Sequence, residues 1–395
     1  MIEEASLYIH VPFCHSRCDY CDFYSVPVPK DSPLKDAYIA RLLQDAEFLF
    51  ARHPLRRVPS VYIGGGTPSA LGEGRIARLL DGVSRFLPDA PLEYTVEANG
   101  ESTGIPFLSA LKPRGVTRLS LGVQTFDGSA RRAVGRTGGD PTEALSRAAA
   151  FFPGGLAADL LTGLPGQDEE AVCADIERLL AFSPAHISLY ALTLAEGTPL
   201  ARRHRAGRGV SLLPSPETAD RLWLTGKARL ERAGFSWYEI ANFARRGAAS
   251  LHNTRYWRME NWLSLGPSSS STVIDDASGT GVRRTVTADL YAWLNRKPGE
   301  APPFREEALD RITLKKEMFL MGFRTEAGPP PELWEKRFGS PLPAASPRVF
   351  SLWRSRGLLR KSRAALTKRG RLVLGRFLPE AFLELEERES GPAGP

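Results

Sequence analysis

Three cysteines near the start of the chain constrain its fold and chemistry more than any other feature. Cys14, Cys18 and Cys21 follow a short apolar run, residues 7–13, in the spacing C-x3-C-x2-C. A structural zinc site needs four protein ligands, and no second Cys or His pair lies nearby in the sequence to complete one. An iron–sulfur cubane has four irons, so three cysteines can hold it and leave one iron open. The spacing therefore predicts a 4Fe-4S cluster with one iron available for chemistry.

Two other interpretations of the cysteines are less consistent with this loop. Cysteines that only fill a core have no reason to recur at this spacing among charged and aromatic residues. A disulfide with one spare thiol would suit a secreted protein, but the start, MIEEASLYIHVPF, has no basic region or cleavage site. No apolar run approaches the ~20 residues of a membrane span. We therefore expect a cytoplasmic protein, with the fourth cysteine, Cys173, inert on a helix.

After the cysteine loop, short β-rich runs alternate with longer runs of helical period, which is typical of βα units around a parallel sheet. The predicted strands are residues 7–13, 60–64, 92–97, 118–124, 156–161 and 186–192. The predicted helices between them are residues 34–52, 73–86, 107–112, 142–151 and 168–182. Six units are too few for a closed eight-stranded ring. The pattern predicts an α/β protein with a partial (β/α)6 barrel.

The pattern changes beyond about residue 200. We predict the barrel over residues 1–200, an α+β segment over 201–300 and a small helical, winged-helix-like C-terminal domain over 301–383. The last unit is expected to contain a glycine turn and a short hairpin next to LTKRG. Residues 384–395 are charged and rich in Gly and Pro, so we expect a disordered tail there.

Polar and glycine-rich clusters follow the predicted strands rather than precede them. Because the carboxyl ends of barrel strands form one mouth, these clusters should converge there. The loop GGGTPS, residues 64–69, lacks three Cβ atoms and can offer backbone N–H groups to a ligand. The single polar candidates at or after later strand ends are Glu97, Gln124, Arg136 and Asp159.

The cysteine spacing, with Tyr20 just before the last cysteine and GGGTPS after the next strand, resembles the signature of radical S-adenosylmethionine enzymes. In that superfamily the open iron is chelated by the amino and carboxylate groups of the methionine moiety. One electron then cleaves the sulfonium to methionine and a 5′-deoxyadenosyl radical, while the protein positions the cofactor. The resemblance implies the partial barrel, S-adenosylmethionine as cofactor and an electron donor such as flavodoxin or ferredoxin.

The resemblance also implies contacts to the cofactor's methionine and ribose. The glycine loop would contact the methionine amino end through Gly65, Gly66 and Thr67. Arg136 would bind the methionine carboxylate with its planar guanidinium group. Asp159 would accept hydrogen bonds from the ribose hydroxyls, as acidic residues do in dinucleotide sites.

Four more residues match positions that contact the cofactor. Glu97 would place a carboxylate beside the ammonium and sulfonium groups. Gln124 offers one donor and one acceptor to the cofactor's polar edges. Tyr20 and Tyr8 also match contacting positions, although a role in the barrel core is an open alternative for Tyr8.

Taken together, the cluster loop, GGGTPS, VEAN, GVQ, GLPGQ and HNTRYW resemble the coproporphyrinogen-III-oxidase-like branch of the superfamily. That branch contains oxygen-independent coproporphyrinogen III dehydrogenase, which decarboxylates two propionates to vinyls, and HemW-type heme chaperones, which deliver heme to haem proteins. The dehydrogenase carries a fourth cysteine where this chain has Phe23, and a longer segment before its cluster than the thirteen residues here. The resemblance is therefore closest to the HemW type.

Residues 250–271, SLHNTRYWRMENWLSLGPSSSS, are dense in aromatic side chains, with one histidine and several arginines. Histidine can ligate haem iron and arginine can pair with propionates, so we predict a heme site with His252 as ligand. A packed hinge over the barrel is the alternative. Ser270 stands where a histidine is common in HemW-type chains, and Thr162 where a tyrosine is common.

The resemblance thus implies a heme chaperone that carries a 4Fe-4S cluster and S-adenosylmethionine. A coproporphyrinogen dehydrogenase, or a radical enzyme on another tetrapyrrole, stays open, and so does the question of turnover. The implied partners are heme or another tetrapyrrole, a haem-receiving client protein and the electron donor. The formal charge of +7 is spread along the chain, which favours a solvated surface over nucleic-acid binding. We expect a monomer or weak dimer, with peripheral membrane contact left open.

Overall fold

The computed structural model describes residues 2–207, 213–297 and 299–389. Its centre is a parallel sheet in which each strand pairs with the next one along the chain. These strands are β2 (Ser6–Val11), β6 (Ser60–Gly65), β7 (Glu93–Asn99), β8 (Arg118–Gln124), β9 (Leu156–Thr162) and β10 (His186–Ala191). Each one overlaps a strand that the sequence predicts. The partial βα barrel is therefore confirmed.

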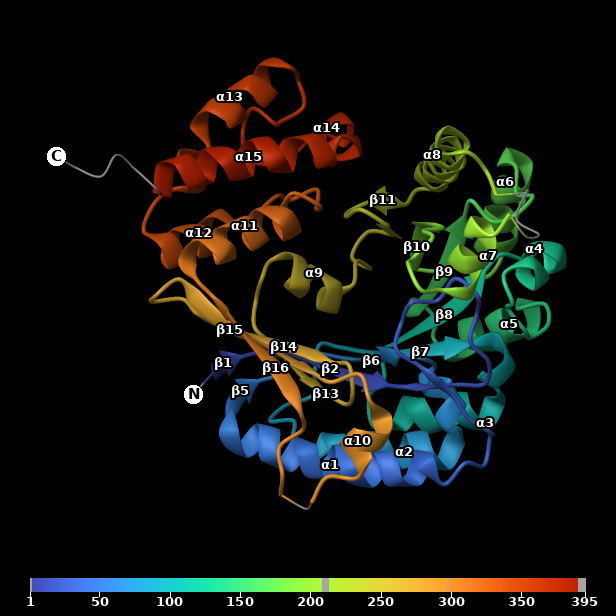
Figure 1. Cartoon of the computed structure of the whole chain (residues 1–395). Helices are drawn as coiled ribbons and strands as arrows, with labels where there is room; N and C mark the ends of the chain where they lie inside the picture. Colours follow the sequence, from blue (N-terminus) through green and yellow to red (C-terminus); the bar gives the residue numbers. More distant parts are fainter. Residues whose placement is uncertain (1, 208–212, 298, 390–395) are drawn as a thin grey trace.

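The helices between these strands cover the outer face of the sheet (Figure 1). They are α1 (Leu34–Arg52), α2 (Glu73–Ser84), α3 (Ile105–Leu111), α4 (Gly128–Ala133), α5 (Thr142–Phe151) and α6 (Glu169–Leu180). In α1, Tyr38 and Leu42 are fully buried while Gln44 and Glu47 are exposed. This 3.6-residue period is why the bounds of α1 could be predicted.

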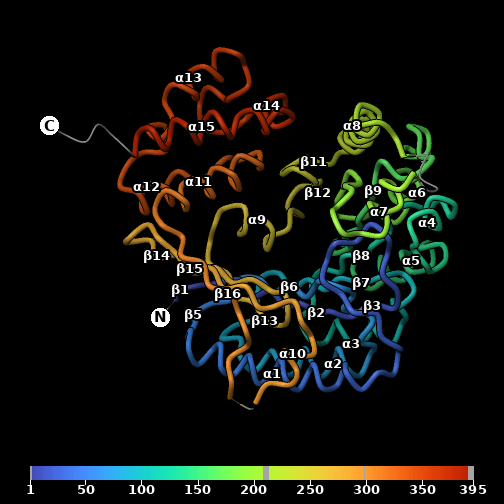
Figure 2. Tube along the Cα trace, viewed as in Figure 1, coloured from blue at the N-terminus to red at the C-terminus, as the bar shows by residue number. Residues whose placement is uncertain are grey.

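The barrel sheet continues at both edges with strands from residues 236–309. β13 (Trp262–Leu265) runs parallel to β2, and β14 (Ser270–Asp275), β15 (Thr280–Val286) and β16 (Phe304–Leu309) follow it in antiparallel order. At the other edge β12 (Asn242–Ala244) and β11 (Ser236–Trp237) pair beyond β10. The result is one twelve-stranded sheet, which Figure 2 shows curving around the molecule. The α+β segment therefore extends the barrel sheet rather than forming its own.

Smaller elements connect these parts. They are β1 (Ile2–Glu4) with β5 (Leu55–Arg57), β3 (Phe13–Cys14) with β4 (Val26–Pro27), and the helices α7 (Pro199–Arg205), α8 (Pro216–Arg232), α9 (Leu251–Trp257) and α10 (Leu290–Leu294). In the part of the chain that the structure describes, no helix is both long and apolar enough to cross a membrane.

The C-terminal region is helical, as predicted, and has a core of its own. Its helices are α11 (Arg311–Gly322), α12 (Pro331–Phe338), α13 (Pro347–Ser355), α14 (Lys368–Leu372) and α15 (Leu374–Glu389). Trp334 and Phe377 lie at the centre of this second core, which also takes in Trp262 and Ile274 from the sheet. The expected hairpin is reduced to one antiparallel bridge between Leu359 and Leu366.

The expectation of a disordered tail from residue 384 is wrong for residues 384–389, which form the last turns of α15. Glu384 is buried and accepts hydrogen bonds from the backbone N–H groups of Arg348 (2.9 Å) and Val349 (2.9 Å) and from the Ser346 hydroxyl (2.7 Å). It thereby caps the N-terminus of α13, whose own residues supply no side-chain cap. The rest of the expected tail, residues 390–395, lies outside the described residues.

Candidate functional site

The cysteine loop follows the carboxyl end of β2 and is held by its neighbours. Cys14 ends β3 and is buried, and its Sγ lies 3.3 Å from the Thr67 hydroxyl. Cys18 and Cys21 are half-buried in a turn closed by the bond from Cys21 N to Cys18 O (3.1 Å). Asp19 between them accepts from the backbone N–H of Leu200 on α7 (2.8 Å). All three thiols are free.

The cysteine sulfurs are not arranged around a single ion. Among the described residues, no group of three or more His, Cys, Asp or Glu side chains converges closely enough to hold one metal ion. A cubane differs from a single ion, since each cysteine binds a different iron. Burial raises the pKa of Cys14, and raises that of Cys21 to about 11. A cationic iron centre would offset this cost of ionisation, so the buried thiols are compatible with ligation of iron.

The glycine loop after β6 packs directly on the cysteine strand. Gly65 has φ of +110°, and a Cβ on it would come within 2.7 Å of the His10 ring. A Cβ on Gly66 would lie 2.7 Å from the carbonyl oxygen of Phe13. The space that the missing Cβ atoms leave is therefore filled by the protein itself. Contact of this loop with a methionine amino group stays a prediction.

Asn99, which the sequence analysis did not single out, connects the glycine loop to Arg136. Its amide Nδ2 donates to the Thr67 hydroxyl (3.0 Å), and its Oδ1 accepts from Arg136 Nη2 (3.1 Å). Arg136 also donates to the Gly122 carbonyl (2.6 Å) and points Nη1 at Cys18 Sγ (3.6 Å). Asn99 closes the VEAN motif, so its position at a strand end was the available signal.

This hydrogen-bonded set adjoins a small cavity whose lining includes Ser16, Cys18, Asn99, Glu101, Arg131 and Arg136. The Arg136 Nε is buried and has no hydrogen-bond partner among the described residues. A buried guanidinium N–H without a partner is costly, and an anionic ligand would satisfy it. The residues present therefore fit a carboxylate-bearing cofactor next to a cysteine-held cluster.

Glu97 and Asp159 line a second cavity inside the barrel. Tyr62 donates its hydroxyl to Glu97 Oε1 (2.6 Å), and Tyr62, Glu97 and Asp159 share this cavity with Tyr190. Burial raises the pKa of Glu97 to about 7 and that of Asp159 to about 6. Gly122 on β8 pairs with Asn99 on one side and Asp159 on the other. The predicted cofactor residues are thus divided between two adjacent cavities.

The remaining candidates lie around these cavities. Tyr8 is next to the barrel cavity, with its hydroxyl 3.1 Å from His10 Nδ1 and its ring stacked on Tyr62 at 6.3 Å. Tyr20 packs against the apolar cluster that contains Leu161. Gln124 ends β8 after a bulge, with φ of 68°, and lines neither cavity.

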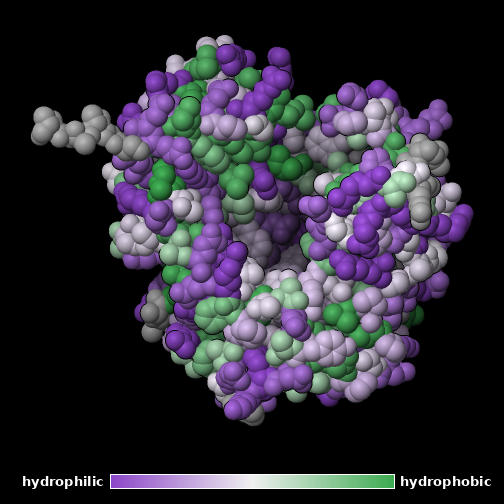
Figure 3. Space-filling view, in the orientation of Figure 1, coloured by the Kyte–Doolittle hydropathy of each residue, from purple (hydrophilic) through white to green (hydrophobic). Residues whose placement is uncertain are grey.

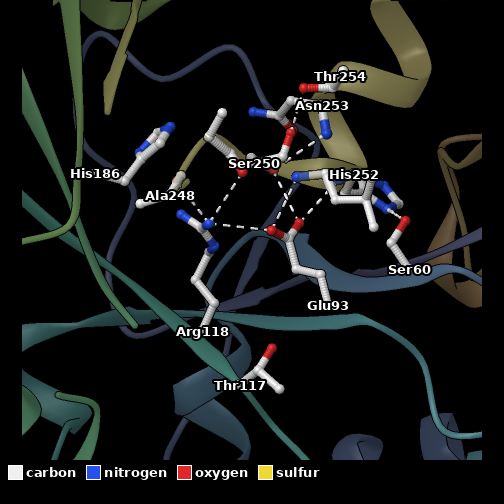
Figure 4. Close-up of polar contacts among 12 residues, drawn as sticks. Ser60, Glu93, Thr117, Arg118, His186, Ala248, Ser250, His252, Asn253 and Thr254 are labelled. Carbon is white, nitrogen blue, oxygen red and sulfur yellow. Dashed lines mark hydrogen bonds and ion pairs between the residues drawn. The ribbon is translucent and has the colours of Figure 1, made fainter. Parts of the chain in front are cut away.

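His252 lies beside the first residues of two barrel strands (Figure 4), which is the end of the barrel opposite the cysteine loop that follows the carboxyl end of β2. Its Nδ1 is 3.0 Å from the hydroxyl of Ser60, the first residue of β6, and its backbone N–H donates to Glu93, the first residue of β7 (2.9 Å). The side chain is 1% exposed, and the rings of Tyr62 and Tyr256 lie against it at 5.0 and 4.7 Å. Its Nε2 is buried and has no hydrogen-bond partner among the described residues. Ligation of heme iron by His252 stays a prediction, and the contacts to Ser60 and Glu93 support the alternative of a packed hinge.

Figure 4 also shows why α9 docks at this end. Glu93 accepts from the Ser250 hydroxyl (3.1 Å) and from the N–H of Leu251 (3.0 Å), in addition to His252. Arg118, the first residue of β8, forms an ion pair with Glu93 at 3.2 Å. Burial lowers the pKa of His252 to about 3, so the imidazole is neutral. The HNTRYW segment thus closes the amino end of the barrel.

The fold and the cysteine loop match known proteins. The model of the radical SAM superfamily matches residues 8–179, from β2 to within α6. The solved structure of coproporphyrinogen III oxidase (HemN) from Escherichia coli superposes with a TM-score of 0.80, covering 98% of this chain and 91% of that one. The two sequences are 21% identical, so this likeness describes the fold alone.

Sequence relatives extend over most of the chain. The heme chaperone HemW of Bacillus subtilis is 31% identical over 95% of this chain and 99% of its own length. HemW of Escherichia coli is 36% identical over 66% of this chain and 68% of its own length. Radical S-adenosyl methionine domain-containing protein 1, mitochondrial, of Bos taurus is 35% identical over 85% of this chain and 76% of its own length.

Proposed function

This chain belongs to the family of the heme chaperone HemW, within the radical SAM superfamily, and from that membership we propose that it binds heme and passes it to haem proteins. The observation that carries this proposal is the similarity to Bacillus subtilis HemW over 99% of that protein's length. Phe23, where the dehydrogenase would carry a further cysteine, supports the same assignment. Its side chain is 64% exposed at the end of the cysteine loop.

We further propose that the chain carries a 4Fe-4S cluster and S-adenosylmethionine. Cys14, Cys18 and Cys21 would each bind one iron and leave the fourth to the cofactor. When bound, the pair supplies reductive cleavage of a sulfonium. Arg136, positioned by Asn99, would hold the methionine carboxylate next to the cluster. Glu97 and Asp159, which burial keeps partly protonated near neutral pH, would face the cofactor's cationic and ribose groups.

An oxygen-independent coproporphyrinogen III dehydrogenase is the second candidate. The superposition with coproporphyrinogen III oxidase favours it at the level of the fold, since both chains are covered over more than nine-tenths of their length. Anaerobic incubation of the reconstituted protein with heme, and separately with coproporphyrinogen III, separates the two. We expect a Soret band that stays with the protein and no vinyl product. Conversion of coproporphyrinogen to protoporphyrinogen would replace the chaperone proposal.

The proposed partners follow from this function. They are a haem-receiving client and a flavodoxin or ferredoxin as reductant, and the three free thiols of the cluster loop suit a reducing compartment such as the cytoplasm. The positive charge is less evenly spread than expected, because residues 347–376 contain ten basic and no acidic side chains. Arg348, Arg360 and Lys368 pair with carboxylates and Arg371 is buried, so the other six cations are the ones that could contact an anionic surface.

A further inference from the structure

A groove of about 570 Å³ lies away from the cluster, between the carboxyl end of α1 and the strands β14 and β15 (Figure 1). A second cavity continues it toward β16 and shares Leu49, His53, Ser271 and Arg284 with it. The volume is in the range of pockets that bind drug-sized ligands. Figure 3 shows a different hollow, between the C-terminal helices and the barrel. The α1 groove therefore needs its own explanation.

The walls of the groove are apolar and partly open to solvent. In the groove, Val282 on β15 is 37% exposed; in the second cavity, Phe48 on α1 is 38% exposed and Phe304 on β16 is 44% exposed. On β14 and β15, alternate residues face the groove, so Val273 and Val282 pair side by side on its floor. The other face of the same strands packs on α11, where Arg283 pairs with Glu317 (2.6 Å). The groove side has no such cover within the described residues.

Two arginine–phenylalanine pairs line the second cavity, and of these four residues only Arg284 also lines the groove. The Arg52 guanidinium lies 5.5 Å from the centre of the Phe48 ring on α1. The Arg284 guanidinium lies 5.4 Å from the Phe304 ring, between β15 and β16. Arg284 also pairs with Glu306 (2.7 Å), whereas Arg52 forms no ion pair among the described residues. Each wall thus offers one flat ring and one cation.

The carboxylates of the lining already have partners. Asp45 pairs with Arg296 (2.7 Å), Asp276 with Lys336 (2.8 Å), and Glu3 with Arg56 (3.3 Å). Asp275 accepts from the N–H of Ala277 at 3.0 Å and closes its own turn. Because these charges are neutralised, the groove favours an anionic ligand through its arginines.

His53 lines both the groove and the second cavity. Of the histidines in this chain, it is the best placed to coordinate the metal of a ligand bound there. Three of the six histidines, His10, His186 and His252, are buried at 5%, 3% and 1% exposure. His15 and His204 are exposed, and neither lines an apolar groove. Burial, together with the cations Arg284 and Arg52, lowers the pKa of His53. Its imidazole is therefore neutral at neutral pH, which is the form that ligates iron.

We infer that heme binds across the groove and the second cavity, with the imidazole of His53, which lines both, on its iron. Arg52 and Arg284 would pair with the two propionates, and the phenyl rings of Phe48 and Phe304 would lie against the macrocycle. A flat, apolar dianion with an open iron coordination position matches this set of groups. The inference rests on the proposed function, which makes heme the cargo, and it places a heme site on the outer side of the barrel, separate from His252.

The test is an anaerobic heme titration of the full reconstituted chain, followed by the Soret band and low-spin EPR. His53→Ala should weaken heme binding by about tenfold or more and shift the Soret band, because the iron loses its ligand. His204→Ala, which changes an exposed histidine on α7, should leave both unchanged. Val282→Glu changes an exposed residue, so it should fold, and its carboxylate should weaken heme binding by about tenfold as well.

Binding of iron-free protoporphyrin IX is the second measurement. This porphyrin can contact the apolar and cationic side chains of the site, but it has no iron for His53 to coordinate. Its binding, followed by fluorescence, should survive His53→Ala and weaken in Val282→Glu. Heme binding by the wild type that His53→Ala and Val282→Glu leave unchanged would overturn this site and leave the proposed function standing. A wild-type chain that binds no heme would overturn both. Iron content and S-adenosylmethionine affinity should be the same in all of these variants.

Discussion

At the carboxyl end of the barrel, Arg136 and Asn99 join loops that carry free thiols, whereas at the amino end Arg118 and Glu93 hold a helix. Both ends contain an arginine, hydroxyl groups and a histidine or cysteine. At the carboxyl end a guanidinium N–H is left without a partner beside a cavity and a thiol. At the amino end Glu93 accepts three hydrogen bonds from one helix N-terminus. Arg118 Nη1 is also buried without a partner among the described residues, so the ends differ in what surrounds the arginine, which is a thiol at the carboxyl end and a docked helix at the amino end.

The HNTRYW segment has a docking role whether or not it also binds heme. Its residue types are those that haem proteins use, but its place is set by strand starts rather than strand ends. Ser60, Glu93 and Arg118 each begin a strand, and all three contact or neighbour α9. Position along a parallel strand therefore carries more information about function than residue type.

The largest effect should come from the cysteine loop. We expect anaerobic reconstitution to give about four irons per chain and a brown chromophore. Alanine at Cys14, Cys18 or Cys21 should abolish the chromophore, since each thiolate holds one iron. Cys173→Ala, on the half-buried side of α6, is the matched control and should keep full iron. If the variant with alanine at all three cysteines retained its iron, the cysteine loop would not be the cluster site.

A substitution at the amino end of the barrel should change the stability of the protein rather than its iron content. Glu93→Ala removes three hydrogen bonds to α9 and leaves the Arg118 charge buried, so it should lower the free energy of unfolding by about 3–5 kcal/mol. Urea unfolding measures this change. Glu47→Ala, at an exposed position on α1, should change stability by less than about 0.5 kcal/mol. A Glu93→Ala protein that keeps its stability but loses its cluster would reverse the roles of the two ends.

Substitution of Arg136 tests whether the carboxyl end of the barrel binds the cofactor. A charge-assisted hydrogen bond is worth about 1.5–3 kcal/mol, so Arg136→Ala should weaken S-adenosylmethionine binding by roughly one to two orders of magnitude. Calorimetry on the reconstituted protein gives the affinity, and iron content must be checked in parallel. Arg132→Ala, an exposed arginine on α4, should bind normally. Unchanged affinity in both Arg136→Ala and Asp159→Ala would remove the cofactor assignment.

The smallest effect should be a pH dependence of stability. Burial raises the pKa of Glu97 to about 7 and that of Asp159 to about 6, above their values in an unfolded chain. Between about pH 4.5 and pH 7 the folded protein therefore holds more protons than the unfolded one, and its stability should fall as the pH rises. Thermal unfolding of the cofactor-free protein at pH 5 and pH 7.5 tests this. Glu97→Gln should flatten the dependence, and an unchanged slope would show that Glu97 does not titrate there.

Several parts of this protein could be read from the sequence because their signals are local. The bounds of α1 follow from its period, and the strand β8 from a run of seven residues with turns on both sides. The three predicted cluster ligands lie within eight positions of each other, from Cys14 to Cys21, so their spacing could be recognised without distant contacts. The candidates Thr67 and Arg136 were also identified from their positions after strands.

Other features depended on pairs of residues that lie far apart in the chain. Asn99 gained its role from Thr67 and Arg136, which lie 32 and 37 positions away. His252 was placed by a hydrogen bond to Glu93, 159 positions away, and by another to Ser60, 192 positions away. Hydrophobic period and spacing predict how a segment folds and which of its faces is buried. They do not state which element that face meets, and only the packing of the whole chain decided that α9 closes the amino end of the barrel.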